Sequence, residues 1–528
     1  MDKYIEPVRI VCSENCEAAE NVFKALPPQA GFCKDDSFLI KAGGYILLDF
    51  GKEIHGCVLV TTLDTSIRPV LGRIVYGESV SEALSSVGEK NATNAHAIRD
   101  MKVEVMPWST VKYGETGFRF AKIEAIDGDI RVKTIKAVPD ILDIEKKGSF
   151  ECDDEKLNKI WEVAAYTVQL NMHEYLWDGI KRDRLVWIGD MHPEVSTIRN
   201  VFGNAQCVTK SLDFVRDETK SDEWMNSMPT YSMWWLIIHY DWFMHWGDFK
   251  YLKEQIPCAK AIVDMAISWI NSGYDCTDFK TFVDWGSRYS AGELDGAKAV
   301  FCMGLDAASR IFEVMGEATY CKKCKDAVLK MRNEKVTVEA NKSMSALTVL
   351  SGRDNALAKK VILDNSLTGI STFMGYYVLL AKAELEDMNG ALDIIRNYWG
   401  AMLDLGATTF WEDFDMSWIE GSAPIDELVP EGKKDIHGDF GKFCYEGFRH
   451  SLCHGWASGP AAFLTQKIAG VEILEPGCKK VKISPDLGNL NWAKISYPTP
   501  FGSIKIDIRK EDANISVNIQ SPTEIEIV

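Results

Sequence analysis

The segment Tyr175-Leu-Trp-Asp-Gly-Ile-Lys-Arg-Asp-Arg-Leu-Val-Trp-Ile-Gly-Asp-Met-His-Pro-Glu194 is the stretch on which the interpretation of the whole chain depends. It holds four acids, two arginines, two tryptophans and a histidine, and glycines interrupt it. Carboxylates accept hydrogen bonds from sugar hydroxyls, and indole rings offer flat apolar faces. Exposed indoles are unfavourable unless something covers them. The segment is therefore interpreted as a sugar-binding loop, with a solvated loop held by local ion pairs as the alternative.

Helical spacing begins on both sides of this loop. Before it, Asp153 and Asp154 are suited to cap a helix, and Leu157, Ile160 and Trp161 follow at helical intervals. After it, many sequential helices with little strand signal indicate helix pairs, and six pairs that close into a ring need about this much chain. Residues 148–470 are thus predicted to form an (α/α)6 toroid. The expected helices lie near residues 194–216, 229–246, 250–271, 296–315, 318–332, 341–350, 356–363, 373–386, 389–403 and 447–468.

Both ends of the chain have the pattern of β structure. Residues 1–147 contain strand-like runs such as Tyr45-Ile-Leu-Leu-Asp-Phe50, separated by glycines, which is typical of a β-sandwich or jelly roll. Residues 471–528 alternate apolar and polar side chains, as in Gly502-Ser-Ile-Lys-Ile-Asp-Ile-Arg509, which predicts a small antiparallel β domain. The predicted fold class is multidomain α+β, with the toroid flanked by these two β domains. A chain of 528 residues also suits about three domains.

The composition excludes several classes of partner. The net charge is −18 and no basic stripe is visible, which argues against nucleic acid and anionic membranes. The N-terminus lacks the apolar core of a secretory signal, and His239, Asp241 and His245 interrupt the densest apolar stretch. We expect a soluble cytoplasmic protein with a carbohydrate substrate, no nucleic acid and no membrane. The oligomeric state stays open, with a homo-oligomer as one option.

The cysteines indicate neither disulfides nor a metal site. The 14 cysteines are scattered and mostly lie in apolar segments, which favours buried free thiols in a chain without a signal peptide. Cys321 and Cys324 form a single CxxC motif, and no second pair follows at the spacing of a zinc ribbon. We therefore predict no metal.

A second acidic motif lies far from the first, in Gly406-Ala-Thr-Thr-Phe-Trp-Glu-Asp-Phe-Asp415. Large aromatic neighbours such as Trp411 can hold Glu412 partly dehydrated, which tunes the basicity of its carboxylate; a carboxylate on the rim is the alternative. Trp285 lies in a predicted loop and is a candidate for a ligand cleft. His454, taken alone, fits either a structural hydrogen bond or a role in binding.

Motifs that are far apart in this chain occur together in one known family. Asp178-Gly-Ile-Lys-Arg-Asp-Arg-Leu-Val-Trp-Ile-Gly-Asp190 is similar to D-x-x-x-R-(D)-E-R-x-G-W-x-G-D. Gly406-Ala-Thr-Thr-Phe-Trp-Glu412 is similar to G-A-T-T-x-W-E, and Ser451-Leu-Cys-His454 to S-L-N-H. Gly43-Gly-Tyr-Ile-Leu-Leu-Asp-Phe-Gly51 is similar to a jelly-roll module that often precedes the toroid. In these motifs the chain resembles the α-L-rhamnosidases of glycoside hydrolase family 78.

The resemblance implies an (α/α)6 barrel, inversion at the anomeric carbon and no cofactor. It also implies two catalytic carboxyls, with Asp183 as the general acid and Glu412 as the base that activates water. Inverting hydrolysis uses such a pair with the carboxyls roughly 6.5–9.5 Å apart. The residues implied or suggested as substrate contacts are Asp178, Arg182, Trp187, Asp190, Glu194, Trp285, Trp411 and His454.

The chain departs from the family pattern at several positions. The family has Glu at the acid position where this chain has Asp183, and the loss of a methylene retracts the carboxyl by about 1.5 Å. Three alternatives follow: the substrate sits deeper, another acid such as Asp190 or Glu194 protonates the leaving group, or activity is lost. The Cys-Pro after the first Asp is Gly179-Ile180 here, and residues 422–440 form a candidate lid.

The function predicted from the sequence is exo-acting, inverting hydrolysis of a terminal α-L-rhamnosyl or related sugar from an oligosaccharide or glycoside. Two alternatives stay open. One is an (α/α)6 glycosidase of different sugar specificity, and the other is a catalytically inactive carbohydrate-binding homologue.

Overall fold

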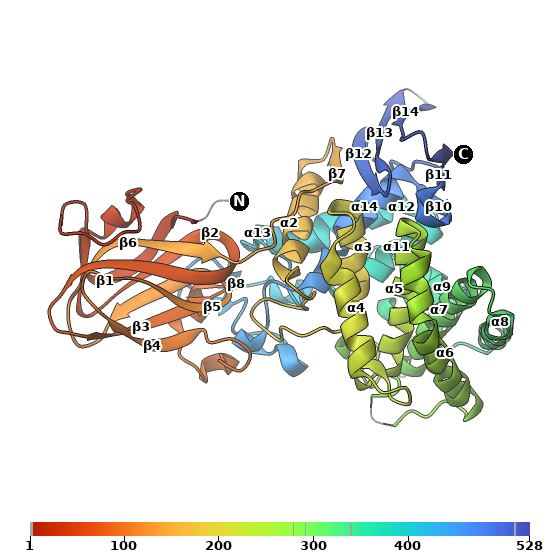
Figure 1. Ribbon diagram of the computed structural model, residues 1–528, viewed down its shortest axis with the longest axis horizontal. Coiled ribbons are helices and arrows are strands. Elements are labelled where there is room, and N and C mark those ends of the chain that lie inside the picture. The colour runs from red at the N-terminus through yellow and green to blue at the C-terminus, as the bar shows by residue number, and fades with distance from the viewer. Residues whose placement is uncertain (1–3, 278, 291, 338–340, 512–513) are drawn as a thin grey trace.

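The computed structural model describes residues 4–277, 279–290, 292–337, 341–511 and 514–528. Figure 1 shows three parts in chain order: an N-terminal β-sheet at one end of the molecule, a large body of helices, and C-terminal strands that pack on the helices. The predicted multidomain α+β fold class is confirmed.

The N-terminal part is one antiparallel sheet that surrounds an apolar core. The long strand β2 pairs with three others along its length, which joins all six strands into the order β1-β2-β5-β3-β4, with β6 also beside β2. A short helix, α1 (Val80–Leu84), follows β3. The strands are β1 (Arg9–Glu17), β2 (Phe38–Thr65), β3 (Val70–Gly77), β4 (Asp100–Val105), β5 (Thr110–Ala125) and β6 (Ile130–Pro139).

The helices form two concentric rings. Six of them contact one another in a closed circle and make the inner ring: α3 (Met191–Val201), α5 (Pro229–Trp246), α7 (Glu293–Val314), α9 (Lys342–Leu350), α11 (Met374–Glu384) and α14 (Gly459–Ala469). The outer ring consists of α2 (Glu155–Asn171), α4 (Gln206–Glu218), α6 (Phe249–Asn271), α8 (Ala318–Arg332), α10 (Ala356–Leu363) and the segment from α12 (Met388–Ile394) through a π-helical turn to α13 (Gly400–Asp404). This is the arrangement expected for an (α/α)6 toroid.

The composition of each helix matches its ring. Helix α5 is apolar on nearly every side and almost fully buried, as an inner helix must be. It begins with Pro229 in its first turn and ends at Gly247, which takes the left-handed conformation that favours glycine. Helix α8 is amphipathic instead, with Cys321 and Cys324 on its buried face and lysines on its exposed face. The CxxC motif is therefore part of the core.

Two predicted helices differ from the observed ones. The segment 194–216 is split between α3 and α4, because the chain turns at Gly203, whose φ is 85°. The segment 447–468 becomes regular only at Gly459, the start of α14. Its first part is irregular because its backbone pairs with other loops: Glu412 N donates to Ser451 O at 2.9 Å, and His454 N donates to Phe410 O at 3.0 Å.

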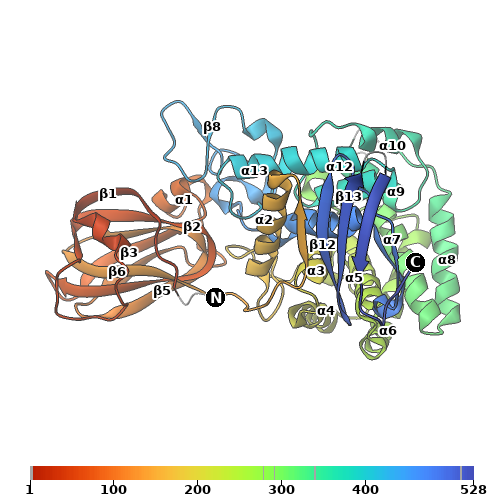
Figure 2. The same ribbon diagram turned by 90° about the horizontal axis from the view of Figure 1, so that it is seen from above.

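The C-terminal part contains two small sheets. One has the order β14-β13-β12-β7, and the other joins β10, β11 and β15. Strand β7 (Ser149–Cys152) precedes α2, the first helix of the toroid, so the C-terminal sheet takes one strand from residues that the sequence assigned to the toroid. Strand β12 contacts α3 and α14. Figure 2 shows β12 and β13 lying over the helices. The strands are β10 (Val471–Glu475), β11 (Lys480–Ile483), β12 (Trp492–Thr499), β13 (Gly502–Glu511), β14 (Asn514–Gln520) and β15 (Glu526–Ile527).

Ionic contacts tie the N-terminal sheet to the toroid. The Arg119 guanidinium of β5 binds both carboxylate oxygens of Asp49, at 2.8 and 3.0 Å, and donates to the carbonyl oxygen of Gly406 at 2.9 Å. It also lies 3.4 Å from Asp426, in the 422–440 segment. This segment, predicted as a lid, contains the short strands β8 (Ser422–Ala423) and β9 (Lys434–Asp435) and packs against the N-terminal sheet.

Two further findings concern the whole chain. All 14 cysteines are free, as the sequence predicts. None of the described helices combines the length and the apolar character required to cross a membrane.

Two glycines allow the packing between the helices and the C-terminal strands to be tested. Gly470 ends α14 with a φ of 66°, and a Cβ there would lie 1.7 Å from Ser484 O. Gly316 has a similar φ of 74°, but a Cβ there would meet nothing within 4 Å. We expect Gly316→Ala to cost about 1 kcal/mol of backbone strain, and Gly470→Ala to cost clearly more, because its backbone must also move. Thermal unfolding of both variants measures the difference, and equal shifts in Tm would contradict the close packing at Gly470.

Candidate active site

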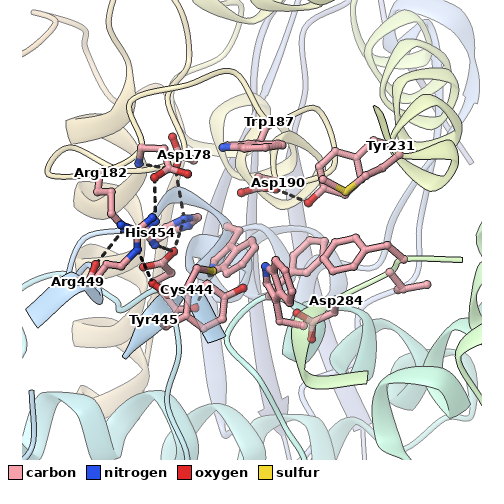
Figure 3. Close-up of a pocket in the computed structure, with 18 residues that line it drawn as sticks. Asp178, Arg182, Trp187, Asp190, Tyr231, Asp284, Cys444, Tyr445, Arg449 and His454 are labelled. Atoms are coloured by element: carbon pink, nitrogen blue, oxygen red, sulfur yellow. Dashed lines mark hydrogen bonds and ion pairs between the residues drawn. The ribbon is translucent and has the colours of Figure 1, made fainter. Parts of the chain in front are cut away.

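A pocket with a cavity volume of about 160 Å³ opens inside the toroid, and 18 residues line it. Most come from loops that are distant in sequence: the loop between α2 and α3, the loop between α6 and α7, and the irregular segments that follow α13; Tyr231 comes from α5. Figure 3 shows two walls, one with Asp178, Arg182 and His454 and one with Trp187, Asp190 and Tyr231.

The carboxylate of Asp178 organises the loop between α2 and α3. Its Oδ2 accepts a hydrogen bond from Asp183 N and its Oδ1 from Leu185 N, both at 2.9 Å. Burial raises the pKa of Asp178 to about 7, and the nearby charge of Asp183 adds to the effect. The loop is therefore folded around a carboxyl group that titrates near neutral pH.

Arg182 lies between two carboxylates. Its Nη1 is 2.8 Å from Asp183 Oδ1, and its Nη2 is 2.6 Å from Glu412 Oε1. Its Nε donates to the carbonyl oxygen of Arg449 at 3.0 Å. Because one planar guanidinium spans both carboxylates, their nearest oxygens lie within about 8 Å of each other. The first two sequence motifs thus meet at this arginine.

Glu412 is buried and held from several directions. Its Oε2 accepts a hydrogen bond from Ser451 N at 3.0 Å, and its carbonyl oxygen accepts from Thr372 Oγ1 and from Trp456 Nε1. Burial raises the pKa of Glu412, whereas the Arg182 charge and the Ser451 N–H oppose the rise. The carboxylate is therefore both fixed in place and poorly solvated, which makes it a stronger base than an exposed one.

His454 completes this wall of the pocket. Its Nε2 lies 3.7 Å from Asp178 Oδ2 and 3.8 Å from Glu412 Oε1. Burial, followed by the Arg182 charge, holds the pKa of His454 well below its usual range, so the ring is neutral near pH 7. Its buried Nδ1 has no hydrogen-bond partner. A neutral imidazole with a free nitrogen is suited to bind a hydroxyl.

The opposite wall is aromatic and acidic. Asp190 Oδ1 accepts a hydrogen bond from the Tyr231 hydroxyl at 3.1 Å, and Trp187 packs edge-on against Tyr231 with ring centres 6.2 Å apart. Burial, followed by the Asp178 charge, holds the pKa of Asp190 well above its usual range. Asp190 therefore keeps its proton more readily than an exposed carboxyl group, and in the protonated form it can donate a hydrogen bond as well as accept one.

The structure brings most of the predicted site residues together. The residues from the sequence that line the pocket are Asp178, Arg182, Asp183, Trp187, Asp190, Trp285, Glu412 and His454. Glu194 and Trp411 lie outside the lining. Glu194 belongs to α3 and is 1% exposed, and Trp411 is also 1% exposed and packs on Phe414 and His450. Trp411 points away from the pocket because successive side chains of an extended segment face opposite sides and Glu412 faces the pocket.

Ten lining residues were not predicted. Asp284 and Trp456 are sequence neighbours of predicted or quoted residues, which is a signal that was available. The others carry no such signal, because Tyr231 lies in an apolar helix and residues 444–449 lie in an irregular loop. The ten are Met228, Tyr231, Phe282, Val283, Asp284, Phe373, Cys444, Tyr445, Arg449 and Trp456.

Two clusters outside the pocket have the residue types of metal ligands. In the first, Glu78, Glu82 and His437 are buried, and Lys181 Nζ lies 2.9 Å from Glu78 and 3.1 Å from Glu82. The ammonium group therefore already supplies the cation that these carboxylates need.

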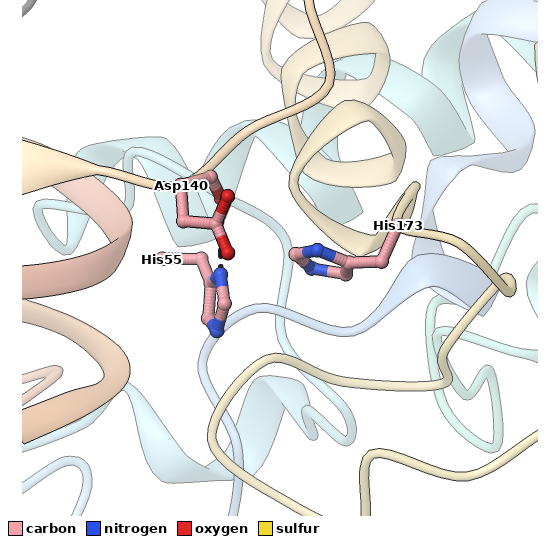
Figure 4. Close-up of side chains that lie close together, drawn as sticks. All are labelled: His55, Asp140 and His173. Carbon is pink, nitrogen blue, oxygen red and sulfur yellow. Dashed lines mark hydrogen bonds between the residues drawn. The ribbon is translucent and has the colours of Figure 1, made fainter.

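The second cluster, His55, Asp140 and His173, is drawn in Figure 4. Both ring nitrogens of His55 are engaged, Nδ1 with Asp140 O at 3.0 Å and Nε2 with Arg184 Nη2 at 2.8 Å. Because the adjacent guanidinium is positive and no ring nitrogen of His55 is free, the geometry favours a contact between the N-terminal sheet and the toroid over an ion site.

Comparisons with known families agree with the fold. Residues 145–333 match the bacterial α-L-rhamnosidase six-hairpin glycosidase domain. Residues 470–528 match the bacterial α-L-rhamnosidase C-terminal domain. The chain therefore carries two domains of the bacterial α-L-rhamnosidase family. The family predicted from the motifs is confirmed.

Individual relatives of these rhamnosidase domains are distant in sequence but similar in structure. An α-L-rhamnosidase of Formosa agariphila is 22% identical over 460 residues, which is 79% of this chain and 47% of that protein. The chain thus spans about half the length of this curated relative. The GH78 rhamnosidase of Bacillus sp. GL1 superposes with a TM-score of 0.73 at 19% identity, over 96% of this chain and 55% of that one. A Klebsiella oxytoca rhamnosidase with rhamnose bound superposes with a TM-score of 0.67 at 19% identity, over 88% of this chain and 95% of that one.

Burial of Glu194 behind the rhamnosidase-like pocket has a measurable consequence. Its Oε1 has no hydrogen-bond partner, and burial, followed by the Asp190 charge, holds its pKa well above its usual range. The folded chain therefore keeps a proton that the unfolded chain loses, so wild-type stability falls as pH rises above about 4.3. We expect Glu194→Gln to gain Tm relative to the wild type as pH increases from about 5 to about 8.

The matched control for this prediction is Glu218→Gln, which changes an exposed glutamate of α4. Its Tm difference from the wild type should be nearly the same at both pH values. If the Tm difference between Glu194→Gln and the wild type is also the same at both pH values, Glu194 is ionised in the folded state.

Proposed function

We propose that the protein is an inverting, exo-acting glycoside hydrolase that removes a terminal α-L-rhamnosyl or closely related sugar from an oligosaccharide or glycoside. The observation that carries the proposal is the pair Asp183 and Glu412, two carboxyl groups joined through Arg182 in the wall of the pocket. The resemblance of the two motifs to family 78 supports the assignment of the sugar.

Glu412 is proposed as the general base. It takes a proton from a water molecule while the water oxygen forms a bond to the anomeric carbon. Burial makes its carboxylate basic, and Arg182 and the Ser451 N–H keep it ionised and oriented. Since these contacts come from two directions, Glu412 needs little reorganisation before it acts.

Asp183 is proposed as the general acid. It gives its proton to the glycosidic oxygen as the bond from that oxygen to the anomeric carbon breaks. Its side chain is 20% exposed, so solvent can restore the proton after each turnover. A separation within about 8 Å from Glu412 is compatible with inversion, in which one water molecule lies between the carboxyls. The resemblance to family 78 supports inversion.

The remaining walls suit a deoxy sugar. Asp178 and Asp190 offer hydrogen bonds to ring hydroxyls, and their raised pKa values let them donate as well as accept near neutral pH. Phe282, Val283 and Phe373 make part of the lining apolar, which favours a methyl group over a hydroxymethyl group. These contacts support rhamnose or another 6-deoxy sugar.

Glu412→Gln tests the proposed base. The amide cannot accept a proton from water, so kcat on 4-nitrophenyl α-L-rhamnoside should fall by about a thousandfold while Tm stays near that of the wild type. Glu420→Gln, an exposed position nearby, serves as the control and should retain activity. NMR of the first product formed by the wild type should show the inverted anomer. Retained turnover in Glu412→Gln would remove this residue from the mechanism.

A comparison of leaving groups tests which residue is the acid. The acid is needed most when the leaving group is a poor one, so its loss should reduce cleavage of methyl α-L-rhamnoside by about a thousandfold and cleavage of the 4-nitrophenyl glycoside much less. We expect this pattern from Asp183→Asn. Asp190→Asn is an equally small change, and it should reduce cleavage of both glycosides by the same factor. If the selective loss on the methyl glycoside appears in Asp190→Asn instead of Asp183→Asn, Asp190 is the acid. If the wild type cleaves no rhamnoside, the result favours a carbohydrate-binding protein without activity.

A further inference from the structure

A loop of the N-terminal domain reaches the proposed catalytic acid. His96, in the connection between α1 and β4, places its Nε2 3.2 Å from Asp183 Oδ1. Both side chains are partly exposed, at 28% and 20%. His96 lies outside the pocket lining.

The loop around His96 is held firmly on the N-terminal domain. Asn94 Oδ1 accepts hydrogen bonds from Arg99 N and Asp100 N, both at 3.1 Å, and Asn94 Nδ2 donates to Asp100 O. The Arg99 side chain is 1% exposed and donates to the carbonyl oxygens of Glu82 and Ser85. His96 is therefore presented by a closed turn whose ends are fixed.

The two oxygens of the Asp183 carboxyl group have different surroundings. Arg182 Nη1 at 2.8 Å and His96 Nε2 at 3.2 Å both contact Oδ1. Within the described part of the chain, Oδ2 makes no hydrogen bond or ion pair. Two nitrogen groups at Oδ1 favour the proton on Oδ2, which is the oxygen left to meet the leaving group.

The N-terminal domain also holds the residue on the other side of Arg182. Lys181 Nζ is buried between Glu78 and Glu82, at 2.9 and 3.1 Å, and donates to the carbonyl oxygens of Phe448 and His450. Both neighbours of Arg182 in the sequence, Lys181 and Asp183, are therefore fixed by side chains from the N-terminal domain.

From these contacts we infer that His96 is a positioning residue that turns the Asp183 carboxyl group so that Oδ2 faces the leaving group. The N-terminal domain thereby completes the catalytic site of the toroid. The inference rests on the proposed function, since it requires Asp183 to act as an acid. This positioning role of His96 differs from a role in folding or in sugar binding, because the loss of His96 should affect only the protonation of the leaving group.

The test compares His96→Phe with His96→Gln on methyl α-L-rhamnoside and 4-nitrophenyl α-L-rhamnoside. Phe removes the nitrogen, so Asp183 loses one of its two contacts, and kcat on the methyl glycoside should fall roughly tenfold to a hundredfold with little change in KM. The 4-nitrophenyl glycoside needs less protonation and should be affected far less. Gln can offer an N–H to Oδ1 and should restore much of the lost rate.

The control is Ile98→Ala, an exposed position of the same loop, which should behave as the wild type on both glycosides. Equal losses on the two substrates, a change confined to KM, or no loss in His96→Phe would overturn the positioning role while leaving the hydrolase intact. If the wild type cleaves neither rhamnoside, the proposed function fails and the inference fails with it. Tm values of all variants show whether any loss reflects unfolding.

Discussion

The site depends on one buried cation between two carboxylates. Arg182 is 3% exposed, and a charge removed from water to that degree must be paired, because its desolvation otherwise costs several kcal/mol. Asp183 and Glu412 supply the pairing, and the carbonyl oxygen of Arg449 fills the remaining direction. The loop after α2, the segment after α13 and the turn before α14 must therefore meet at one point. The ring of helices is what holds these three loops at that distance.

The acidic side chains that line the pocket differ in their surroundings, and Arg182 is one cause of the difference. Asp178 and Asp284 are buried, and burial raises their pKa values to about 7 and about 6. Burial also holds the pKa of Asp190 well above its usual range, while the hydrogen bond from the Tyr231 hydroxyl opposes the rise. Burial therefore shifts these three carboxyls toward the protonated form, whereas the Arg182 charge favours the ionised form of Glu412. Different surroundings thus act on carboxyls that line one pocket, which is how their pKa values are set apart.

The sequence predicted the parts of this arrangement that depend on local pattern. The bounds of α5 follow from Pro229 and Gly247, and the two motifs identified Asp183 and Glu412 because acids and aromatics are dense there. Contacts between distant segments could not be predicted. Arg449 enters the pocket because its own carbonyl oxygen accepts from Arg182, across more than two hundred residues of chain. The sequence also did not predict which side chains face the pocket: Glu412 lines it and the adjacent Trp411 does not.

The contribution of the N-terminal domain follows from the same reasoning about charge. Lys181 precedes Arg182 and would add a second buried cation to the site, where it would repel the first. Glu78 and Glu82 of the N-terminal domain draw the Lys181 ammonium away and neutralise it, which leaves Arg182 as the cation shared by Asp183 and Glu412. A toroid without this domain would have to expose or neutralise Lys181 in another way, and the loop from 178 to 190 would shift with it. The β-domain that precedes the toroid therefore contributes to the electrostatics of the pocket, and the geometry of the Asp183 and Glu412 carboxyls depends on how the domains dock.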